Sequence, residues 1–260
     1  MKKFTGIFVF GLCAALLLTF GGCADDQVFE QGDYTADPSV TGLVLNAQDR
    51  EIEIVESDGT QILLTYYESQ KEYYDFSVAD GVLTVTYVTD KGWTDYIGSK
   101  PDAQYRRIRI EIPADLLADL DISTTNEKIS LQGVSASGSI TLSSNGGDLD
   151  LETVAAGENL NLTAKNGSIS LQGVSASGTM ALNSDGGDLN LDAVDAGEGL
   201  NLTAKNGNIS GSILGGWDDF AITCEVKKGD TNLPEQKPGG EKFLNVSCNN
   251  GDVNLELVQA

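Results

Sequence analysis

Cysteine and acidic side chains are the residues of this 260-residue chain that could carry chemistry, because histidine is absent altogether. Without an imidazole, Ser-His-Asp and Cys-His catalysis are excluded, and so are the common zinc sites. Cysteine occurs four times, at positions 13, 23, 224 and 248. We expect no catalytic residues, no metal and no cofactor, and we predict that the chain is not an enzyme.

Cys23 follows a leader that is typical of export. Two lysines precede the apolar run 4–20, which is shorter than the roughly 20 residues needed to span a bilayer. The stretch Thr19–Cys23 resembles a bacterial lipobox, in which the cysteine is diacylated and becomes the new N-terminus. We therefore predict that residues 1–22 are a lipoprotein signal peptide and that Cys23 is the lipidation site. The alternative is an ordinary signal peptide followed by an incidental cysteine.

Acidic residues outnumber basic ones by 39 to 16, a net charge of −23. Removing residues 1–22 removes two lysines and no acid, which leaves 39 acids against 14 bases and a net charge of −25. Such a surface repels nucleic acid, and it either attracts cationic partners or serves solubility alone. The expected partners are the membrane, through the anchor, and an envelope protein, a glycan or a cationic peptide.

Carboxylates recur near the turns of the second half of the chain, where stacked oxygens could hold calcium. The glycine-rich nonapeptide pattern of calcium-binding β-rolls is missing, however, and Ser168 or Asn208 takes the place of aspartate in alternate repeats. A solvated acidic face is the favoured interpretation. The residues concerned are Asp148, Asp150, Asp185, Asp188 and Asp252.

Two segments that contain aromatic residues are candidates for a binding role. Asp218 and Asp219 follow Trp217, as in a polysaccharide-cleaving site with an aromatic platform. Adjacent residues of a strand point to opposite faces, so these carboxylates would not flank one bond. The interval 90–104, with Trp93 and Tyr96, is the longest irregular piece and is either a partner-binding loop or a cover for a sheet edge.

The elements that must position these residues are all strands. Residues 23–40 are polar and predict a flexible tether. Residues 41–119 contain short β-type runs separated by turns such as Asp58–Gly59 and Asp80–Gly81. This N-terminal β region is expected to be continuous with a repeat region, 120–260, that ends in a cap.

The repeat region has a long period of 40 residues that halves to 20. Corner glycines recur at this step, and so do alternating apolar positions. A coil of about 20 residues cannot bury its own apolar side chains, but stacked coils can, and the pattern therefore predicts an all-β parallel β-helix, or β-solenoid. We expect the Asn-Gly corners to use positive φ angles, with an atypical entry at Glu127 and an insertion at 224–238. The corner glycines are Gly147, Gly167, Gly187 and Gly207, followed by Gly229 and Gly251.

The two remaining cysteines share one sequence pattern. Cys224 and Cys248 each follow two alternating apolar residues and align with the inward position of Ala204. This alignment predicts that they stack in neighbouring coils. They would then form either a disulfide or a pair of small buried thiols.

The chain resembles the bacterial family of extracytoplasmic proteins labelled "putative adhesin", a domain of unknown function. The resemblance spans about residues 40–258 and is carried by Arg109–Pro113, Leu120–Asn126, the repeated Asn-Gly-x-Ile corners and Asn245–Val253. It implies a β-solenoid, display at the cell surface and a role in adhesion or envelope stress.

These observations favour a non-catalytic cell-surface lipoprotein that binds a partner. A structural spacer without a specific ligand is the main alternative, and a carbohydrate-active enzyme is disfavoured. The expected location is extracytoplasmic, on the cell membrane of a bacterium.

Overall fold

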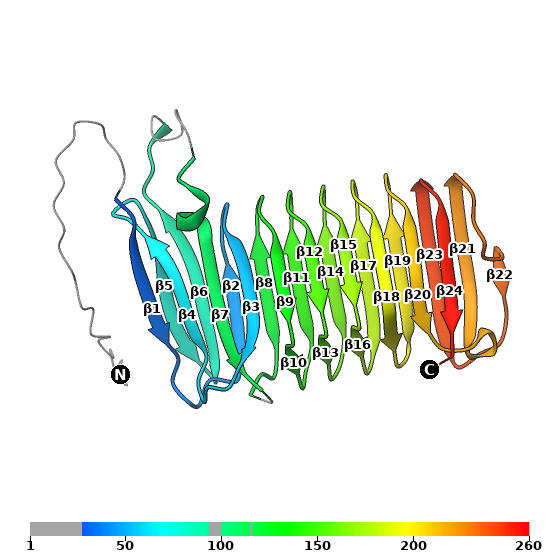
Figure 1. Ribbon diagram of the computed structural model, residues 1–260, viewed down its shortest axis with the longest axis horizontal. Helices are drawn as coiled ribbons and strands as arrows, with labels where there is room; N and C mark the ends of the chain where they lie inside the picture. Colours follow the sequence, from blue (N-terminus) through cyan, green and yellow to red (C-terminus); the bar gives the residue numbers. More distant parts are fainter. Residues whose placement is uncertain (1–27, 94–99, 115, 260) are drawn as a thin grey trace, which may run out of the picture.

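The computed structural model describes residues 28–93, 100–114 and 116–259, and these form an all-β solenoid (Figure 1). The long sides of the coils are two sheets. Sheet A runs in spatial order through β1 (Glu30–Thr35), β4 (Leu63–Glu68), β7 (Arg107–Pro113), β3 (Glu51–Ser57), β9 (Ile129–Gln132), β12 (Leu149–Glu152), β15 (Ile169–Gln172), β18 (Leu189–Ala196), β20 (Ile209–Leu214) and β24 (Val253–Val258). The predicted fold class is confirmed.

Sheet B forms the opposite side of the solenoid. Its spatial order is β5 (Glu72–Ala79), β6 (Val82–Thr89), β2 (Gly42–Asn46), β8 (Leu120–Thr124), β11 (Ile140–Ser144), β14 (Leu160–Ala164), β17 (Thr179–Ser184), β19 (Gly199–Ala204), β23 (Lys242–Asn250), β21 (Phe220–Lys228) and β22 (Gln236–Lys237). A third, narrow side contains the short strands β10 (Ser135–Ala136), β13 (Ala155–Ala156) and β16 (Ser175–Ala176). The short 3-10 helices η2 (Ala103–Arg106) and η3 (Trp217–Asp219) lie outside the repeats.

In the repeat region, the 20-residue sequence period sets the pairing between neighbouring strands of each sheet. Leu142 pairs with Leu162, which pairs with Leu182, and all three side chains are buried. Because alternate residues of a strand point to one face, this register stacks equivalent apolar side chains into a single continuous core. The strands pair in parallel, so the Asn-Gly corners do not form antiparallel hairpins.

The 40-residue period reflects two kinds of corner that alternate along the axis. In one kind, the hydroxyl of Ser184 accepts a hydrogen bond from Gly187 N at 2.9 Å and donates to the carbonyl of Gly167 at 3.0 Å. In the other kind, alanine occupies the same inward position, as at Ala164 and Ala204. Coils therefore repeat by shape every 20 residues and by hydrogen bonding every 40.

Four of the corner glycines, Gly147, Gly167, Gly187 and Gly207, do not have the positive φ angles that we expected, whereas Gly229 (φ 137) and Gly251 (φ 158) in the cap do. Gly167 is required because a Cβ atom there would lie 2.1 Å from the carbonyl oxygen of Gly147, in the coil below. Positive φ occurs instead directly after β9, β12 and β15 and at the equivalent position within β18, at Gly133, Thr153, Gly173 and Ala193. The corners are thus restricted by the close stacking of backbones and not by turn geometry.

The N-terminal end is more ordered than the sequence indicated. The segment 23–40 was expected to be a flexible tether, but β1 pairs antiparallel with β4. Tyr34 of β1 stacks on Phe76 of β5, with 4.3 Å between the ring centroids, and this contact joins the two sheets at the end of the solenoid. The polar composition concealed β1 because an edge strand at the end of a sheet needs little apolar surface.

The last two coils of the C-terminal cap do not stack in chain order, because β23 lies between β19 and β21. Gly251 accordingly stacks on Gly207, and Gly229 stacks on Gly251. Strand β21 is therefore one position removed from β19, and β23, which comes later in the chain, occupies the position between them. No helix in the described part of the chain is long and apolar enough to cross a membrane.

Candidate functional site

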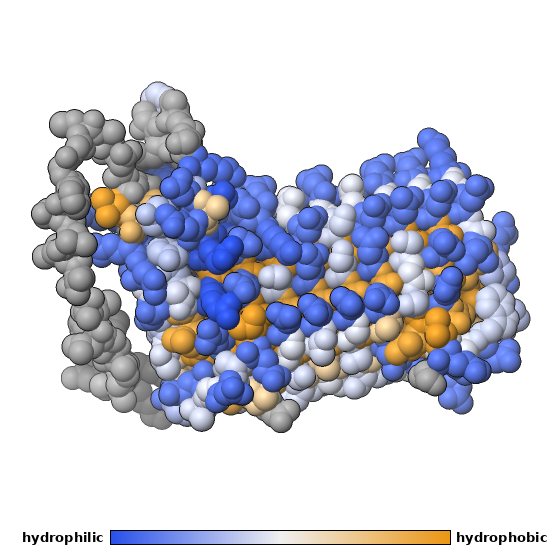
Figure 2. Space-filling view, in the orientation of Figure 1, coloured by the Kyte–Doolittle hydropathy of each residue, from blue (hydrophilic) through white to orange (hydrophobic). Residues whose placement is uncertain are grey.

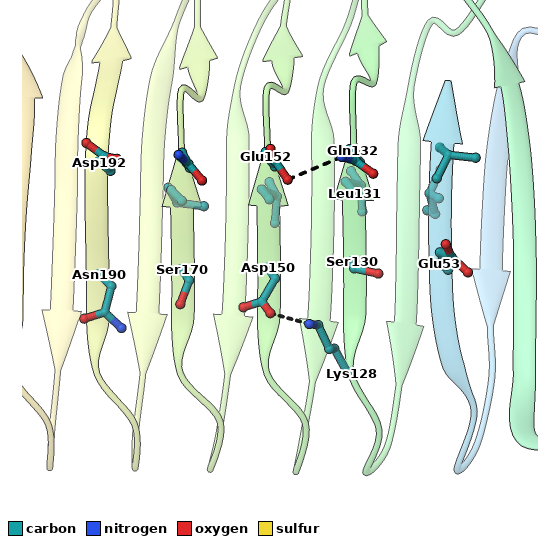
Figure 3. A pocket seen from close by; sticks show the side chains of 15 residues that line it. Glu53, Lys128, Ser130, Leu131, Gln132, Asp150, Glu152, Ser170, Asn190 and Asp192 are labelled. Atoms are coloured by element: carbon teal, nitrogen blue, oxygen red, sulfur yellow. Dashed lines mark hydrogen bonds and ion pairs between the residues drawn. The ribbon is translucent and has the colours of Figure 1, made fainter. Parts of the chain in front are cut away.

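A shallow hollow of about 530 Å³ crosses the outer face of sheet A (Figure 3). We call it the sheet A hollow. It extends from β3 across β9, β12 and β15 to β18, and outward side chains of these strands line it in two rows that run along the solenoid axis. The first row contains Ser130, Asp150, Ser170 and Asn190, and the second contains Gln132, Glu152, Gln172 and Asp192.

The two rows differ in their exposure to solvent. Side chains of the second row are exposed, whereas Ser130, Asp150 and Ser170 of the first row are half-buried. In Figure 2, hydrophilic side chains form a row along the solenoid axis, with hydrophobic residues visible beside it. The sheet A hollow is therefore a long polar trough over the leucines of the core, such as Leu131.

Hydrogen bonds and ion pairs hold part of the lining in place. Gln132 Nε2 donates to Glu152 Oε2 at 3.4 Å, and Lys128 Nζ lies 2.5 Å from Asp150 Oδ2. Both pairs link neighbouring coils. Because these side chains are partly exposed to solvent, each pair contributes little to stability. They fix the directions of the side chains instead.

The outer face of sheet B has a different chemistry. From β11 to β23, its two outward rows contain only serine, threonine, asparagine and alanine. Asn245 Nδ2 donates to Asn201 Oδ1 at 3.0 Å, so this face also makes hydrogen bonds within a row. In a chain with 39 acidic residues, the carboxylates are therefore concentrated on sheet A and at the corners.

The corner aspartates bind backbone. Asp148 Oδ1 accepts a hydrogen bond from Ser168 N at 2.8 Å, and Asp188 Oδ1 accepts one from Asn208 N at 2.7 Å. Ser168 and Asn208 do the same for the next coils, through Asp188 N and Asp252 N. Any short acceptor serves this ladder, which explains why aspartate, serine and asparagine alternate there.

Asp252 Oδ1 likewise accepts a backbone hydrogen bond, from Asp230 N at 2.9 Å, whereas the two other acidic positions of the calcium hypothesis form ion pairs with lysines. Asp185 Oδ1 lies 2.7 Å from Lys205 Nζ, and Asp150 pairs with Lys128. In the part of the chain that the structure describes, no group of three or more acidic or cysteine side chains is placed to hold a metal ion.

Trp217, Asp218 and Asp219 form the 3-10 helix η3 and not a strand, so the argument from alternating strand faces does not apply. Asp219 Oδ2 accepts a hydrogen bond from Gly216 N at 2.6 Å, which uses this carboxylate to close a turn. Lys237 Nζ lies over the Trp217 ring, 5.4 Å from its centre, in a cation–π contact with one face of the ring.

The predicted partner-binding loop is described only in part. Trp93 is 78% exposed, whereas Tyr96 lies outside the described residues. Cys23 also lies outside them. The lipid anchor and the binding role of this loop therefore stay predictions.

Cys224 and Cys248 lie on neighbouring strands with both side chains buried, but they are not directly opposite each other. Cys248 occupies the inward position of Ala204, as predicted. Cys224 pairs with Val246, so the predicted alignment of β21 is wrong by two residues. Diagonal neighbours lie about 7–8 Å apart, beyond the roughly 4.4–6.8 Å between Cα atoms that a disulfide bridges.

We expect both cysteines to remain free thiols in protein exported to an oxidising compartment. Burial, with smaller effects from Asp252 and Cys224, raises the pKa of Cys248 and so disfavours the reactive thiolate. Alkylation should be slow in the native protein and complete after unfolding without reductant, as measured by peptide mass mapping. A Cys224→Ala variant should lose one labelled peptide only. Recovery of a peptide pair joined by a disulfide would contradict this register.

The N-terminal end contains a buried ionic cluster that the sequence pattern did not predict. Arg50 and Glu72 form an ion pair and are 2% and 1% exposed, and Lys91 pairs with the other oxygen of Glu72. Tyr87 OH donates to Glu72 at 2.8 Å, and Arg50 Nε donates to Tyr74 OH at 3.0 Å. The sequence feature that could have predicted this cluster is Glu72, a charged residue at an inward position of an alternating strand.

The fold and the site together define a class of protein: a parallel β-solenoid with capped ends and regular polar rows on its faces. The chain belongs to the Toastrack DUF4097 family, whose model matches residues 40–260. No curated protein matches the chain significantly.

Solved bacterial structures are similar to the chain over most of its length. One, described as a putative adhesin from Bacteroides fragilis, is 15% identical, with 90% of this chain and 98% of that chain covered and a TM-score of 0.44. Another putative adhesin, from Parabacteroides merdae, is 12% identical, with 89% and 93% covered and a TM-score of 0.45. A putative cell adhesion protein from Clostridium sporogenes is 13% identical, with 89% and 100% covered and a TM-score of 0.34.

Proposed function

We propose that this chain is a non-catalytic, adhesin-like surface module that a lipid on Cys23 anchors to the outside of a bacterial cell membrane. The proposal rests on one observation, which is where the first and last strands lie along the solenoid. Strand β1, which follows the leader, lies at the opposite end of the solenoid from β21 and β22 (Figure 1). An anchor before β1 would let the long axis extend from the membrane and present the sheet faces to partners.

The acidic side chains support a non-catalytic role. Asp148 and Asp188 bind backbone between coils, Asp219 closes a turn, and Glu72 is buried in an ionic cluster. Asp148, Asp188 and Asp219, which sequence patterns offered for chemistry, thus support the fold. What the solenoid presents to solvent is hydrogen-bonding surface on a rigid scaffold.

Cys23→Ser is expected to release the protein from the membrane fraction or to leave it as an unprocessed precursor. Two or three acyl chains anchor a protein stably, whereas an unacylated chain lacks that attachment. Cell fractionation and intact-mass measurement test this, and Cys13→Ser, which changes a cysteine inside the leader, is the matched control. Equal membrane retention of wild type and Cys23→Ser, with masses that differ only by the replacement of sulfur with oxygen, would refute the anchor.

A further inference from the structure

We propose that the sheet A hollow binds an extended β-1,4-linked glycan with acetamido groups, which lies along the solenoid axis. This inference rests on the proposed function, since it names the partner that the displayed module would bind. Three properties of the hollow carry it: the chemistry of the lining, the spacing of the coils and the charge.

In the second row of the lining, amide side chains and carboxylate side chains alternate from coil to coil. Gln132 and Gln172 offer both hydrogen-bond donors and acceptors, whereas Glu152 and Asp192 offer acceptors only when ionised. An acetamido group carries one N–H donor and one carbonyl acceptor, so it satisfies a carboxylate and an amide in adjacent coils. The hydroxyl groups of a sugar can hydrogen-bond to the half-buried first row, which contains Ser130 and Ser170.

The distance between neighbouring coils determines which extended polymer can stay in register with the rows. Neighbouring coils are about 4.8 Å apart, so the two-coil repeat of this lining is about 9.6 Å. That distance is close to the length of one disaccharide in an extended β-1,4-linked chain, in which every second sugar turns the same edge toward the protein. An extended peptide repeats every two residues, at about 6.6 Å, and would lose register with the rows within a few coils.

Charge excludes acidic polymers. The lining contains Glu53, Asp150, Glu152 and Asp192 against the single ammonium of Lys128. Two of these carboxylates already have cationic neighbours, because Asp150 pairs with Lys128, and Glu53 Oε1 lies 2.6 Å from Arg109 Nη1. The remaining negative charge repels polyanions and leaves carboxylate oxygens available to the N–H and O–H donors of a neutral glycan.

The test measures binding of chitohexaose, an acetamido-bearing β-1,4-linked hexasaccharide, to the full-length protein in detergent by isothermal titration calorimetry. Gln132→Ala combined with Gln172→Ala is expected to weaken the affinity at least tenfold. The matched control is Asn161→Ala with Asn201→Ala, which removes two amides with the same 40-residue separation from the outer face of sheet B. This control is expected to change the affinity less than twofold, and circular dichroism verifies the folding of both variants.

Cellohexaose, which lacks acetamido groups, should bind more weakly than chitohexaose, and polygalacturonate should not bind. Absence of chitohexaose binding would overturn the inference, as would an equal loss in both double variants. Polylysine that binds the sheet A hollow while chitohexaose does not would show that a cationic peptide is the partner. None of these outcomes affects the membrane anchor, which Cys23→Ser tests separately.

Discussion

Gly167→Ala is expected to lower the free energy of unfolding by about 3 kcal/mol or more. The added Cβ would lie 2.1 Å from the carbonyl oxygen and 2.5 Å from the carbonyl carbon of Gly147, and neither atom can rotate away. The coils would have to separate locally, which would weaken the backbone hydrogen bonds and core contacts on both sides of the corner. Chemical denaturation followed by circular dichroism measures the change.

Gly173→Ala is the matched control. Gly173 has φ +60, but a Cβ atom added there would meet no atom within 4 Å beyond its chain neighbours, and Ala193 already adopts φ 52 at the equivalent turn. Its expected cost is only the roughly 1–2 kcal/mol of a left-handed residue other than glycine. If both substitutions cost the same, backbone stacking would not be what restricts the corners.

Glu72→Gln is expected to lower the free energy of unfolding at pH 7 by about 3–5 kcal/mol, because it leaves buried Arg50 without its carboxylate. Glu51→Gln is the matched control, since Glu51 pairs with Arg107 on the surface, where ion pairs contribute about 1 kcal/mol or less. Urea denaturation of the three proteins at constant ionic strength measures both differences.

The cost of Glu72→Gln should depend on pH. Burial raises the pKa of Glu72, but hydrogen bonds from Lys91, Arg50 and Tyr87 outweigh burial, so this pKa lies below its ordinary value of about 4.3. A lowered carboxyl pKa contributes stability above the unfolded-state pKa, and that stability is lost as the pH falls through the folded-state pKa. The difference between wild type and Glu72→Gln should therefore be constant near pH 7 and shrink below about pH 4.3. A difference that grows on acidification would contradict this assignment.

The sequence by itself determined the solenoid, its 20-residue coil and its core. Leu142, Leu162 and Leu182 could be placed correctly because alternation and exact repetition are local properties, and parallel stacking is the arrangement that buries every copy equally. Asp80 and Gly81 could likewise be assigned to a turn, and both have positive φ between β5 and β6.

Only the tertiary structure decided how the ends close and what the faces present. Several alternating strands fit the position beside β19 equally well, so pattern alone could not show that β23 precedes β21 or that Cys224 lies opposite Val246. The partners of Arg50 and Glu72 are likewise fixed by contacts between different strands, and so is the hollow that the periodic rows of sheet A line. Local periodicity specifies which side chains point inward, whereas the order of stacking depends on the packing of the whole solenoid.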